Sequence, residues 1–325
     1  MQHNKALWVI GSVVLLVQLW NARESSGVTV HDRVSEVIFE PSANALAHLI
    51  SQPDDVSIDA EYRLDHWGIV SFEPVPAYEI DTHDPTTQDV YISGSVHSSR
   101  IWDPYVWSKL VNILQDVPTG RTPVMVDVGA NVGYFSLAAA ALGARVIAFE
   151  PMSRNARKLS KSIIRNRFQD SVTLYQNAVW DTGASFPLRL VATSALNQGN
   201  GKVSHDSYAH GVYGVDFVNT ISLSDAVNQD VDVMKIDTEG TEGAVIAGAK
   251  RLICGFRVKY VVMEFTDIKG RDDKYSAENM LRFMDAVGYA VSDVTPNAPS
   301  LSISDYMSFP PNILFSLKGN RAICD

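Results

Sequence analysis

Cysteines and glycosylation signals are nearly absent from this chain. Its 325 residues include two cysteines, Cys254 and Cys324, and no Asn-X-Ser/Thr sequon. Two cysteines are too few for a disulfide scaffold or a cysteine-rich zinc module. The sequence does not decide whether they pair, and no sequon marks a lumenal side.

Positive charge is also in short supply. The chain has 27 Lys and Arg against 37 Asp and Glu, a net charge of -10, whereas non-specific nucleic-acid binding needs clustered cations. The excess is local, because residues 31–120 hold 15 acidic and 4 basic side chains while residues 121–325 hold 21 of each. We therefore expect no nucleic-acid partner and interpret the acidic segment as a solvated surface. The total charge does not indicate the charge of a substrate.

Long apolar runs are limited to one. Ala6–Trp20 contains 15 residues and would span about 22 Å as a helix, somewhat less than a bilayer core. Because Lys5 precedes it, the run predicts a single-pass signal-anchor with a cytoplasmic N-terminus, of the Golgi or ER type in a eukaryote. A cleaved signal peptide, which would give a secreted protein, is the main alternative, although the bulky Trp20 lies two residues before Ala22, the nearest small residue. A buried helix is a third interpretation.

The acidic segment is poor in regular patterns. It is rich in proline and acidic residues, and we expect one hairpin, formed by residues 68–72 and 90–93. Apolar residues at helical spacing then predict a helix over 102–114, with Pro104 in its first turn. The sequence thus divides into an anchor, a loop-rich extension and a main domain, at residues 1–22, 23–95 and 96–325.

From Pro123 onward, the sequence alternates between strand and helix patterns. The apolar run Val124–Val128 predicts a buried central strand, and Tyr134–Leu142 predicts a helix. Arg145–Phe149 predicts a second strand, which ends at Glu150. A glycine-rich turn between strand and helix, followed about 20 residues later by a carboxylate, is typical of a nucleotide-binding βαβ unit.

The glycine-rich turn discriminates between nucleotides. It reads Asp-Val-Gly-Ala-Asn-Val-Gly from Asp127 to Gly133, with Asn131 where a dinucleotide-binding turn has its middle glycine. The Asp127 carboxylate would repel a pyrophosphate, but it suits a cationic ligand with an amino group, such as S-adenosylmethionine. We expect Glu150 to bind both ribose hydroxyls. A tight turn without a ligand is the alternative.

This stretch resembles the first motif of the FkbM-type S-adenosylmethionine-dependent methyltransferases. The similarity continues in VTLYQNAVWD (172–181), VNTISLSDAV (218–227), VDVMKIDTEGTEGAVIAGA (231–249) and YVVMEF (260–265). It implies a Rossmann-like class I α/β fold, with a seven-stranded, mostly parallel sheet, an antiparallel edge strand and helices on both faces. It also implies methyl transfer to oxygen, often on a sugar or natural-product hydroxyl.

These motifs predict a set of cofactor-binding residues. The set is Asp127, Gly129, Ala130, Asn131, Gly133, Tyr134, Glu150, Pro151, Asn177, Ala178 and Asp237. Further along, a helix over 276–287 and strands over 289–294 and 313–317 would complete the sheet.

A second polar cluster follows the strand predicted at 231–236. Asp237 comes at the carboxyl end of that strand, where open α/β sheets bind ligands. We expect Asp237 or Glu239 to remove a proton from the acceptor, and Lys235 to hold the carboxylate or the developing anion. Glu242 begins a predicted helix, and its expected role is mainly to cap it.

A rival mechanism uses a divalent metal. Asp237 and Glu264, at the ends of adjacent predicted strands, offer oxygen ligands that suit Mg²⁺, which would polarise the hydroxyl. No third ligand is evident in the sequence, so we expect no metal site.

Two further segments carry polar residues without a specific motif. Residues 193–214 are long enough to form a substrate loop or lid, and we expect its His205 and His210 to be solvent-exposed. Basic residues recur at helical spacing after the second strand, and we interpret them as a solvated helix face: Arg154, Arg157, Lys158, Lys161, Arg165 and Arg167.

The sequence therefore predicts a membrane-bound O-methyltransferase that uses S-adenosylmethionine to methylate a hydroxyl of a sugar, glycan or glycolipid. The choice of a glycan substrate rests on the predicted membrane anchor. The choice of oxygen as the methyl acceptor rests on the family resemblance alone. One alternative is a non-catalytic membrane adaptor that retains the fold, which the intact turn argues against. Another is an NAD(P)-dependent oxidoreductase, disfavoured by Asp127, by Asn131 and by the lack of a Tyr-X-X-X-Lys pair after a later strand.

Overall fold

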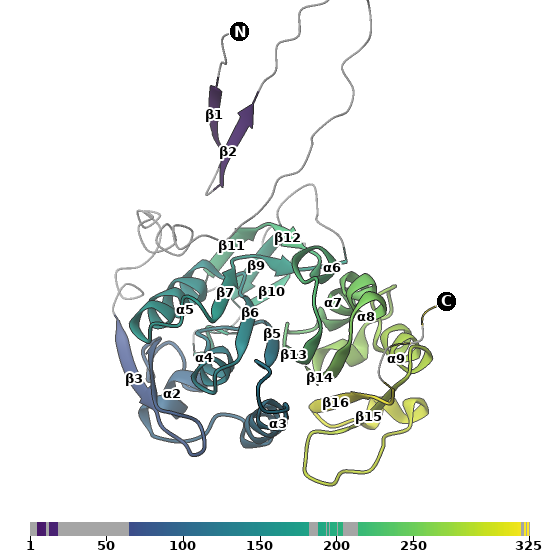
Figure 1. Ribbon diagram of the computed structural model, residues 1–325. Coiled ribbons are helices and arrows are strands. Elements are labelled where there is room, and N and C mark those ends of the chain that lie inside the picture. The colour runs from purple at the N-terminus through teal and green to yellow at the C-terminus, as the bar shows by residue number, and fades with distance from the viewer. Residues whose placement is uncertain are drawn as a thin grey trace, which may run out of the picture. The chain divides into compact units, whose positions relative to one another are not determined.

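The computed structural model describes residues 5–10, 13–18, 65–181, 188–192, 194, 196–199, 201–203, 214–319, 322 and 324 (Figure 1). The chain divides into two compact units, residues 1–40 and 41–325, and each is described by itself. The division falls well before residue 96, where the sequence predicts that the main domain begins.

The first unit contains a short antiparallel hairpin. Strand β1 (Lys5–Ile10) pairs with β2 (Val13–Gln18), with Lys5 opposite Gln18. The prediction of a helix is therefore wrong for these residues. The runs contain several valines together with Ile10, and β-branched residues favour strands. In the part of the chain that the structure describes, we find no helix with the length and apolar character needed to cross a membrane.

The second unit is built on a seven-stranded sheet with the order β15-β16-β14-β13-β5-β6-β7. Strand β16 runs antiparallel to both of its neighbours, and the other pairs are parallel. The predicted mostly parallel sheet is thus confirmed, although its antiparallel strand lies one position in from the edge. The strands are β5 (Val124–Val128), β6 (Arg145–Phe149), β7 (Val172–Tyr175), β13 (Val231–Ile236), β14 (Val258–Glu264), β15 (Tyr289–Asp293) and β16 (Asn312–Leu317).

Helices cover both faces of the central sheet (Figure 1), and alternate residues of its strands belong to two different buried clusters. Met125 and Val146 belong to one buried cluster, with α3 (Pro104–Gln115), α4 (Tyr134–Ala141) and α5 (Ser153–Arg165). Val126 and Ile147 belong to a second, with α6 (Leu223–Ala226), α7 (Glu242–Gly248), α8 (Lys250–Gly255) and α9 (Ala277–Ala286). Because both faces are covered, the central strands are largely apolar, with Asp127, Asp232 and Lys235 as buried charged exceptions.

A hairpin from the acidic segment packs against α5. It joins β3 (His66–Val70) to β4 (Tyr78–Thr82), whereas residues 92–97 form α2 (Ile92–His97), so the predicted pairing of 68–72 with 90–93 is wrong. Asp81 of β4 and Lys158 of α5 form a buried ion pair at 3.1 Å. Part of the acidic segment thus neutralises part of the basic helix face, where the sequence suggested two solvated surfaces.

Helix α3 confirms the predicted helix and places its first turn beside the sheet. Asp103 caps the helix by accepting a hydrogen bond from the N–H of Val106 at 3.1 Å, and Pro104 occupies the first turn. The indole ring of Trp107 packs on Tyr134 of α4, with 5.0 Å between ring centroids. This packing holds the capping loop, including Asp103, at a fixed place.

Two small sheets follow β7 in the chain. Strand β8 (Ala178–Val179) pairs with β12 (Thr220–Ile221), and β9 (Leu188–Ala192) lies between β10 (Gly201–Val203) and β11 (Gly214–Val218). Leu190 of β9 packs with Met152, which caps α5, so the second small sheet lies close to the start of that helix. His205 and His210 lie outside the described residues.

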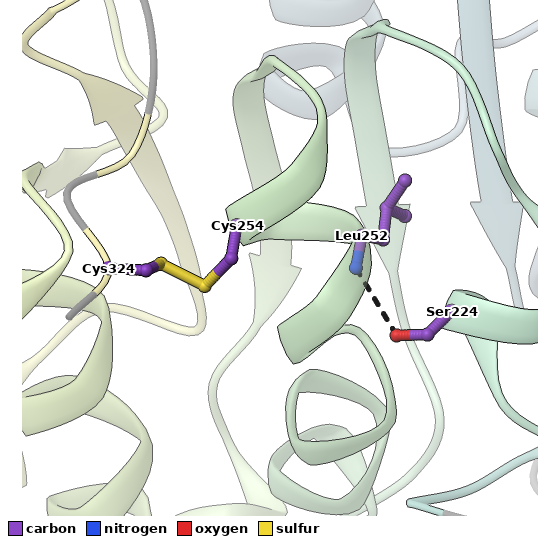
Figure 2. The surroundings of a disulfide bond; sticks show 4 residues. All are labelled: Ser224, Leu252, Cys254 and Cys324. Atoms are coloured by element: carbon purple, nitrogen blue, oxygen red, sulfur yellow. Dashed lines mark hydrogen bonds between the residues drawn. A yellow bond between two sulfur atoms is a disulfide. The ribbon is translucent and has the colours of Figure 1, made fainter.

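A disulfide bond joins the C-terminal tail to α8. Cys254 bonds to Cys324, 70 residues away in sequence, with 5.7 Å between their Cα atoms. Figure 2 shows this bond and, nearby, the hydroxyl of Ser224 accepting the N–H of Leu252 at 3.3 Å. The loop closed by the disulfide contains α9, β15 and β16, with two 3₁₀ helices, η2 (Asp267–Gly270) and η3 (Ile303–Ser308).

Candidate functional site

The glycine-rich turn is held against the end of β13. Gly129 has φ of 78°, and a Cβ atom there would lie 1.8 Å from the carbonyl oxygen of Asp237. The N–H of Asp237 donates in turn to the carbonyl of Val128 at 3.0 Å. Only glycine allows this close approach. The turn and the polar cluster after β13 therefore form one site.

Asn131 and Gly133 complete the turn with positive φ angles of 53° and 93°. The side-chain oxygen of Asn131 accepts the N–H of Val132 at 2.8 Å. Asparagine tolerates this backbone region better than most residues, which accounts for its presence where a dinucleotide-binding turn has glycine. A Cβ atom at Gly133 would lie 2.2 Å from Cδ1 of Leu159, so this glycine brings α4 close to α5.

Glu150 stabilises the glycine-rich turn and the start of α5 through hydrogen bonds to backbone N–H groups. Its carboxylate accepts the N–H of Asn131 at 2.8 Å and the N–H of Met152 at 2.9 Å. Burial raises the pKa of Glu150 to about 7, although these hydrogen bonds oppose the rise. Glu150 thus positions the turn. Its contact with ribose hydroxyls would use its remaining lone pairs and stays a prediction.

A pocket with about 380 Å³ of space, part of it open to solvent, lies beside the turn. Four predicted cofactor-binding residues line it: Gly129, Pro151, Asn177 and Ala178. The other lining residues are Val128, Phe149, Val179, Trp180, Leu190, Gly201, Val203, Thr238 and Thr241. Apolar walls with a few neutral polar groups suit a flat heterocycle such as adenine, so these residues fit a nucleoside cofactor.

Sequence reasoning missed most of the pocket wall. Thr238 directly follows Asp237, so its place in the motif could have revealed it. Leu190 and Gly201 belong to the second small sheet, which carries no recognisable motif. These contacts depend on tertiary structure alone.

Tyr134, predicted as a cofactor-binding residue, is a core residue. Its side chain is buried, and its ring packs against Trp107 and, edge to face, against Phe135. Its hydroxyl accepts the N–H of Trp102 at 3.2 Å. This side chain anchors α3 to the turn and does not line the pocket, and a contact between Tyr134 and the cofactor stays a prediction. Ala130 is likewise buried and outside the pocket wall.

Lys235 connects the two ends of the site. Its Nζ donates to the carbonyl oxygen of Gly129 at 2.9 Å and lies 3.3 Å from Asp237 and 3.6 Å from Asp127. Burial lowers the pKa of Lys235, but the two carboxylates outweigh burial and the net shift is upward. Asp127 is fully buried and also accepts the hydroxyl of Ser136 at 2.6 Å. Its predicted contact with a cofactor amino group stays a prediction, because the amine beside it here is Lys235.

Three carboxyl groups gather at the ends of β13 and β14. Oxygen atoms of Asp237, Glu239 and Glu264 all lie within 4.8 Å of one another. Burial and the charge of Asp237 raise the pKa of Glu264 to about 9 and that of Glu239 to about 7. At neutral pH Glu264 therefore holds a proton, and Glu239 is poised to gain or lose one.

The same cluster bears on the metal alternative. Glu239 supplies the third oxygen ligand that the sequence did not reveal, beside Asp237 and Glu264. Three carboxylates are a set that Mg²⁺ accepts. However, the charge of Lys235 and the proton on Glu264 already reduce the negative charge of the cluster without a metal.

Glu242, expected mainly to cap its helix, forms hydrogen bonds with the loop that precedes α7. One of its carboxylate oxygens accepts the N–H groups of Thr238 and Gly240, both at 3.1 Å. These bonds fix the loop between β13 and α7, which carries Asp237 and Glu239. Glu242 thus acts on the site through the loop.

Comparisons with known proteins give one family match and several similar solved structures. Residues 127–291 match the model of the Methyltransferase FkbM domain family. Methyltransferase FkbM from Methylobacillus flagellatus KT has 16% identity and a TM-score of 0.38, and the match covers 60% of this chain and 43% of that one. Magnesium protoporphyrin IX methyltransferase from Synechocystis PCC 6803 has 11% identity and a TM-score of 0.36, with 65% and 77% covered. Curated proteins give no significant match.

The family match coincides with the site. It begins at Asp127, immediately before the glycine-rich turn, and it includes Glu150, the pocket wall and the three-carboxyl cluster. It spans more than half of the 325 residues. The chain therefore belongs to the FkbM methyltransferase family.

Proposed function

We propose that this chain is an S-adenosylmethionine-dependent O-methyltransferase that acts on a hydroxyl of a sugar, glycan or glycolipid. The observation that carries the proposal is the contact between Gly129 and Asp237, which joins the cofactor turn to the carboxyl cluster. Gly129 and Thr238 both line the pocket, so a nucleoside cofactor held there lies next to candidate bases. A base next to a nucleoside cofactor is what methyl transfer to a hydroxyl requires.

Different residues in and around the pocket are suited to bind different parts of the cofactor. The apolar side chains of Phe149, Val179 and Leu190 suit the adenine ring, and Asn177 offers polar contacts at its edge. Glu150 keeps the turn in its binding shape and has lone pairs for ribose hydroxyls. The bound cofactor supplies an electrophilic methyl group. The chain has to orient an acceptor hydroxyl and remove its proton.

Glu239 is the base that we favour for this proton. Its pKa of about 7 lies close to physiological pH, where a general base works best. Asp237, held 3.3 Å from the Lys235 amine, then orients the hydroxyl by accepting a hydrogen bond from it. Glu264 keeps its proton and limits the repulsion among the three carboxyl groups. A metal at the same cluster would take over the role of activating the hydroxyl.

The disulfide bond supports a site of action outside a reducing cytosol. Bonds such as Cys254–Cys324 persist in the secretory pathway and outside cells, and they are rare in cytosolic proteins. We therefore propose that the main domain lies in an oxidising compartment, the location that both the signal-anchor and the cleaved-signal interpretations predict. Protease protection of the epitope-tagged full chain in microsomes tests this location, and digestion of the main domain without detergent would contradict it.

A methyl-transfer screen tests the activity. The full chain is incubated with S-adenosylmethionine carrying a radiolabelled methyl group and an array of neutral glycans and glycolipids. We expect label on at least one hydroxyl-bearing acceptor and its loss in Asp237→Asn. Cofactor binding with no transfer to any acceptor would favour the non-catalytic adaptor. Tight binding of NADH without binding of S-adenosylmethionine would favour an oxidoreductase.

A further inference from the structure

An apolar patch lies on the surface next to the glycine-rich turn. Val90, Tyr91 and Leu196 are 39%, 46% and 46% exposed, although large apolar side chains are usually buried. The N–H of Val90 donates to the carbonyl of Leu196 at 3.1 Å, and the rings of Tyr91 and Trp102 meet edge to face with centroids 5.9 Å apart. Four residues from three separate segments thus form one patch, which we call the aromatic platform.

The platform is tied to the cofactor turn on one side. The backbone N–H of Trp102 donates to the hydroxyl of Tyr134, the first residue of α4. The segment that carries Leu196 continues to Gly199, where a Cβ atom would lie 2.2 Å from the Asn131 side chain. The platform and the turn that positions the cofactor are therefore held together.

On the other side, Asp103 connects the platform to the carboxyl cluster. Asp103 follows Trp102 directly, and its carboxylate accepts the side-chain amide of Asn312 at 2.9 Å. Asn312 pairs with Glu264 across strands β16 and β14. Burial raises the pKa of Asp103, and the nearby charge of Asp237 raises it further. The platform thus leads through Asp103 and Asn312 to Glu264, a member of the carboxyl cluster that also contains the proposed base Glu239.

This combination of groups selects a particular ligand chemistry. A pyranose has an apolar C–H face that stacks on an aromatic ring, and hydroxyls that need both donors and acceptors. The side-chain amide of Asn312 donates, while the carboxylates of Asp103 and Asp237 accept. An anionic acceptor would meet these carboxylates unfavourably. A cationic one gains less, because Asp237 is already paired with Lys235.

We propose that the aromatic platform, with Asp103 and Asn312, binds the acceptor as a neutral sugar ring and presents one hydroxyl to the carboxyl cluster. This rests on the proposed function, because it identifies the acceptor site of that reaction. Tyr91 and Trp102 are then specificity-determining residues, and neither takes part in cofactor binding.

Saturation-transfer difference NMR on the full chain tests this site, with and without S-adenosylhomocysteine. The probes are the methyl glycosides of glucose, galactose and mannose, with glucose 6-phosphate and spermidine as the anionic and cationic comparisons. The variants are Tyr91→Ala, Trp102→Ala and Tyr91→Phe. Trp67→Ala is the matched control, because Trp67 lies on β3 and is 37% exposed. Circular dichroism checks that each variant folds.

We expect at least one neutral glycoside to show transfer, with its affinity reduced about fivefold or more in Tyr91→Ala and Trp102→Ala and unchanged in Tyr91→Phe and Trp67→Ala. If no glycoside shows a saturation-transfer signal, or if the signal is unchanged in Tyr91→Ala and Trp102→Ala, the proposed sugar site on the aromatic platform is wrong. Binding of spermidine alone overturns the choice of a neutral sugar. Titration calorimetry with S-adenosylhomocysteine separates the two proposals, because failure of that binding contradicts the proposed function without removing the sugar site.

Discussion

The amine of Lys235 lies 3.3 Å from the carboxylate of Asp237 and donates to the carbonyl of Gly129 at 2.9 Å. One buried cation thus links the carboxyl cluster to the cofactor turn. The third partner, Asp127, is fully buried, so its negative charge depends on Lys235 for compensation.

Replacing Lys235 with Met should destabilise the domain strongly. The change leaves Asp127 buried without its cation, and breaking a buried ion pair costs about 3–5 kcal/mol. Urea unfolding at pH 7, followed by circular dichroism, measures the loss. Lys318→Met is the control, because Lys318 is 61% exposed and lies 3.9 Å from Asp285, and it should change stability by about 1 kcal/mol or less. Equal stability of the two variants would show that Asp127 needs no compensation.

The rate of methyl transfer should depend on pH in a bell shape. Glu239 acts as a base only when ionised, so the rate should rise as pH increases through about 7. Glu264 limits repulsion only while protonated, so the rate should fall as pH increases through about 9. Glu239→Gln should lower kcat by about 100-fold or more and remove the rising limb. Glu264→Gln should keep the rising limb and lose the falling one. A Glu239→Gln variant with the wild-type profile would exclude Glu239 as the base.

The central strands were predictable because burial on both faces requires mostly apolar residues, which form a recognisable local pattern in the sequence. Val124–Val128 and Val231–Ile236 consist mainly of apolar residues, and the structure gives both strands the same bounds. The glycine-rich turn was predictable for a similar reason, because its backbone angles demand glycine or asparagine at fixed positions. The family match confirms the methyltransferase identity that these motifs indicated.

The contacts between distant segments were not predictable. Asp81 and Lys158 lie 77 residues apart, and nothing in the local sequence distinguishes their pairing from two separate solvated surfaces. The role of Glu239 as a third oxygen ligand was not predictable from the sequence, because Glu239 lies on a loop. Its positive φ of 56° helps to set the direction of its side chain. The apolar run near the N-terminus has a composition that suits either a helix or a hairpin, and the structure forms the hairpin.

Removal of divalent metals should leave methyl transfer unchanged. The proton on Glu264 and the charge of Lys235 already compensate the cluster that Asp237 and Glu239 share with them. The enzyme is treated with EDTA, desalted and assayed with and without added Mg²⁺ or Mn²⁺. We expect rates that agree within about twofold, far less than the effect of losing a metal that activates a hydroxyl. A rate that EDTA abolishes and Mg²⁺ restores would contradict this, and would make the three carboxyl groups a metal site.

Replacing Glu150 with Ala should weaken cofactor binding about tenfold or more. The variant loses the acceptor of the Asn131 and Met152 N–H groups, and unpaired buried donors cost roughly 1–3 kcal/mol each, so the turn relaxes. Calorimetric titration with S-adenosylhomocysteine measures the affinity. Glu278→Ala is the control, because Glu278 pairs with Arg282 on the exposed side of α9. Unchanged affinity in Glu150→Ala would remove Glu150 from the cofactor site.

Loss of the disulfide bond should destabilise the domain without changing the site. Cys254 and Cys324 close a loop with a sequence separation of 70 residues, and a loop of that length is worth about 4 kcal/mol in the chain-entropy model. We expect Cys254→Ser to lower the free energy of unfolding and to leave the affinity for S-adenosylhomocysteine unchanged, because the bond joins α8 to the tail and neither cysteine lines the pocket. Dithiothreitol should lower the melting temperature of the wild type but have no effect on Cys254→Ser. A wild-type melting temperature that does not respond to dithiothreitol would show that the bond contributes no stability. It would also weaken the case for an oxidising compartment.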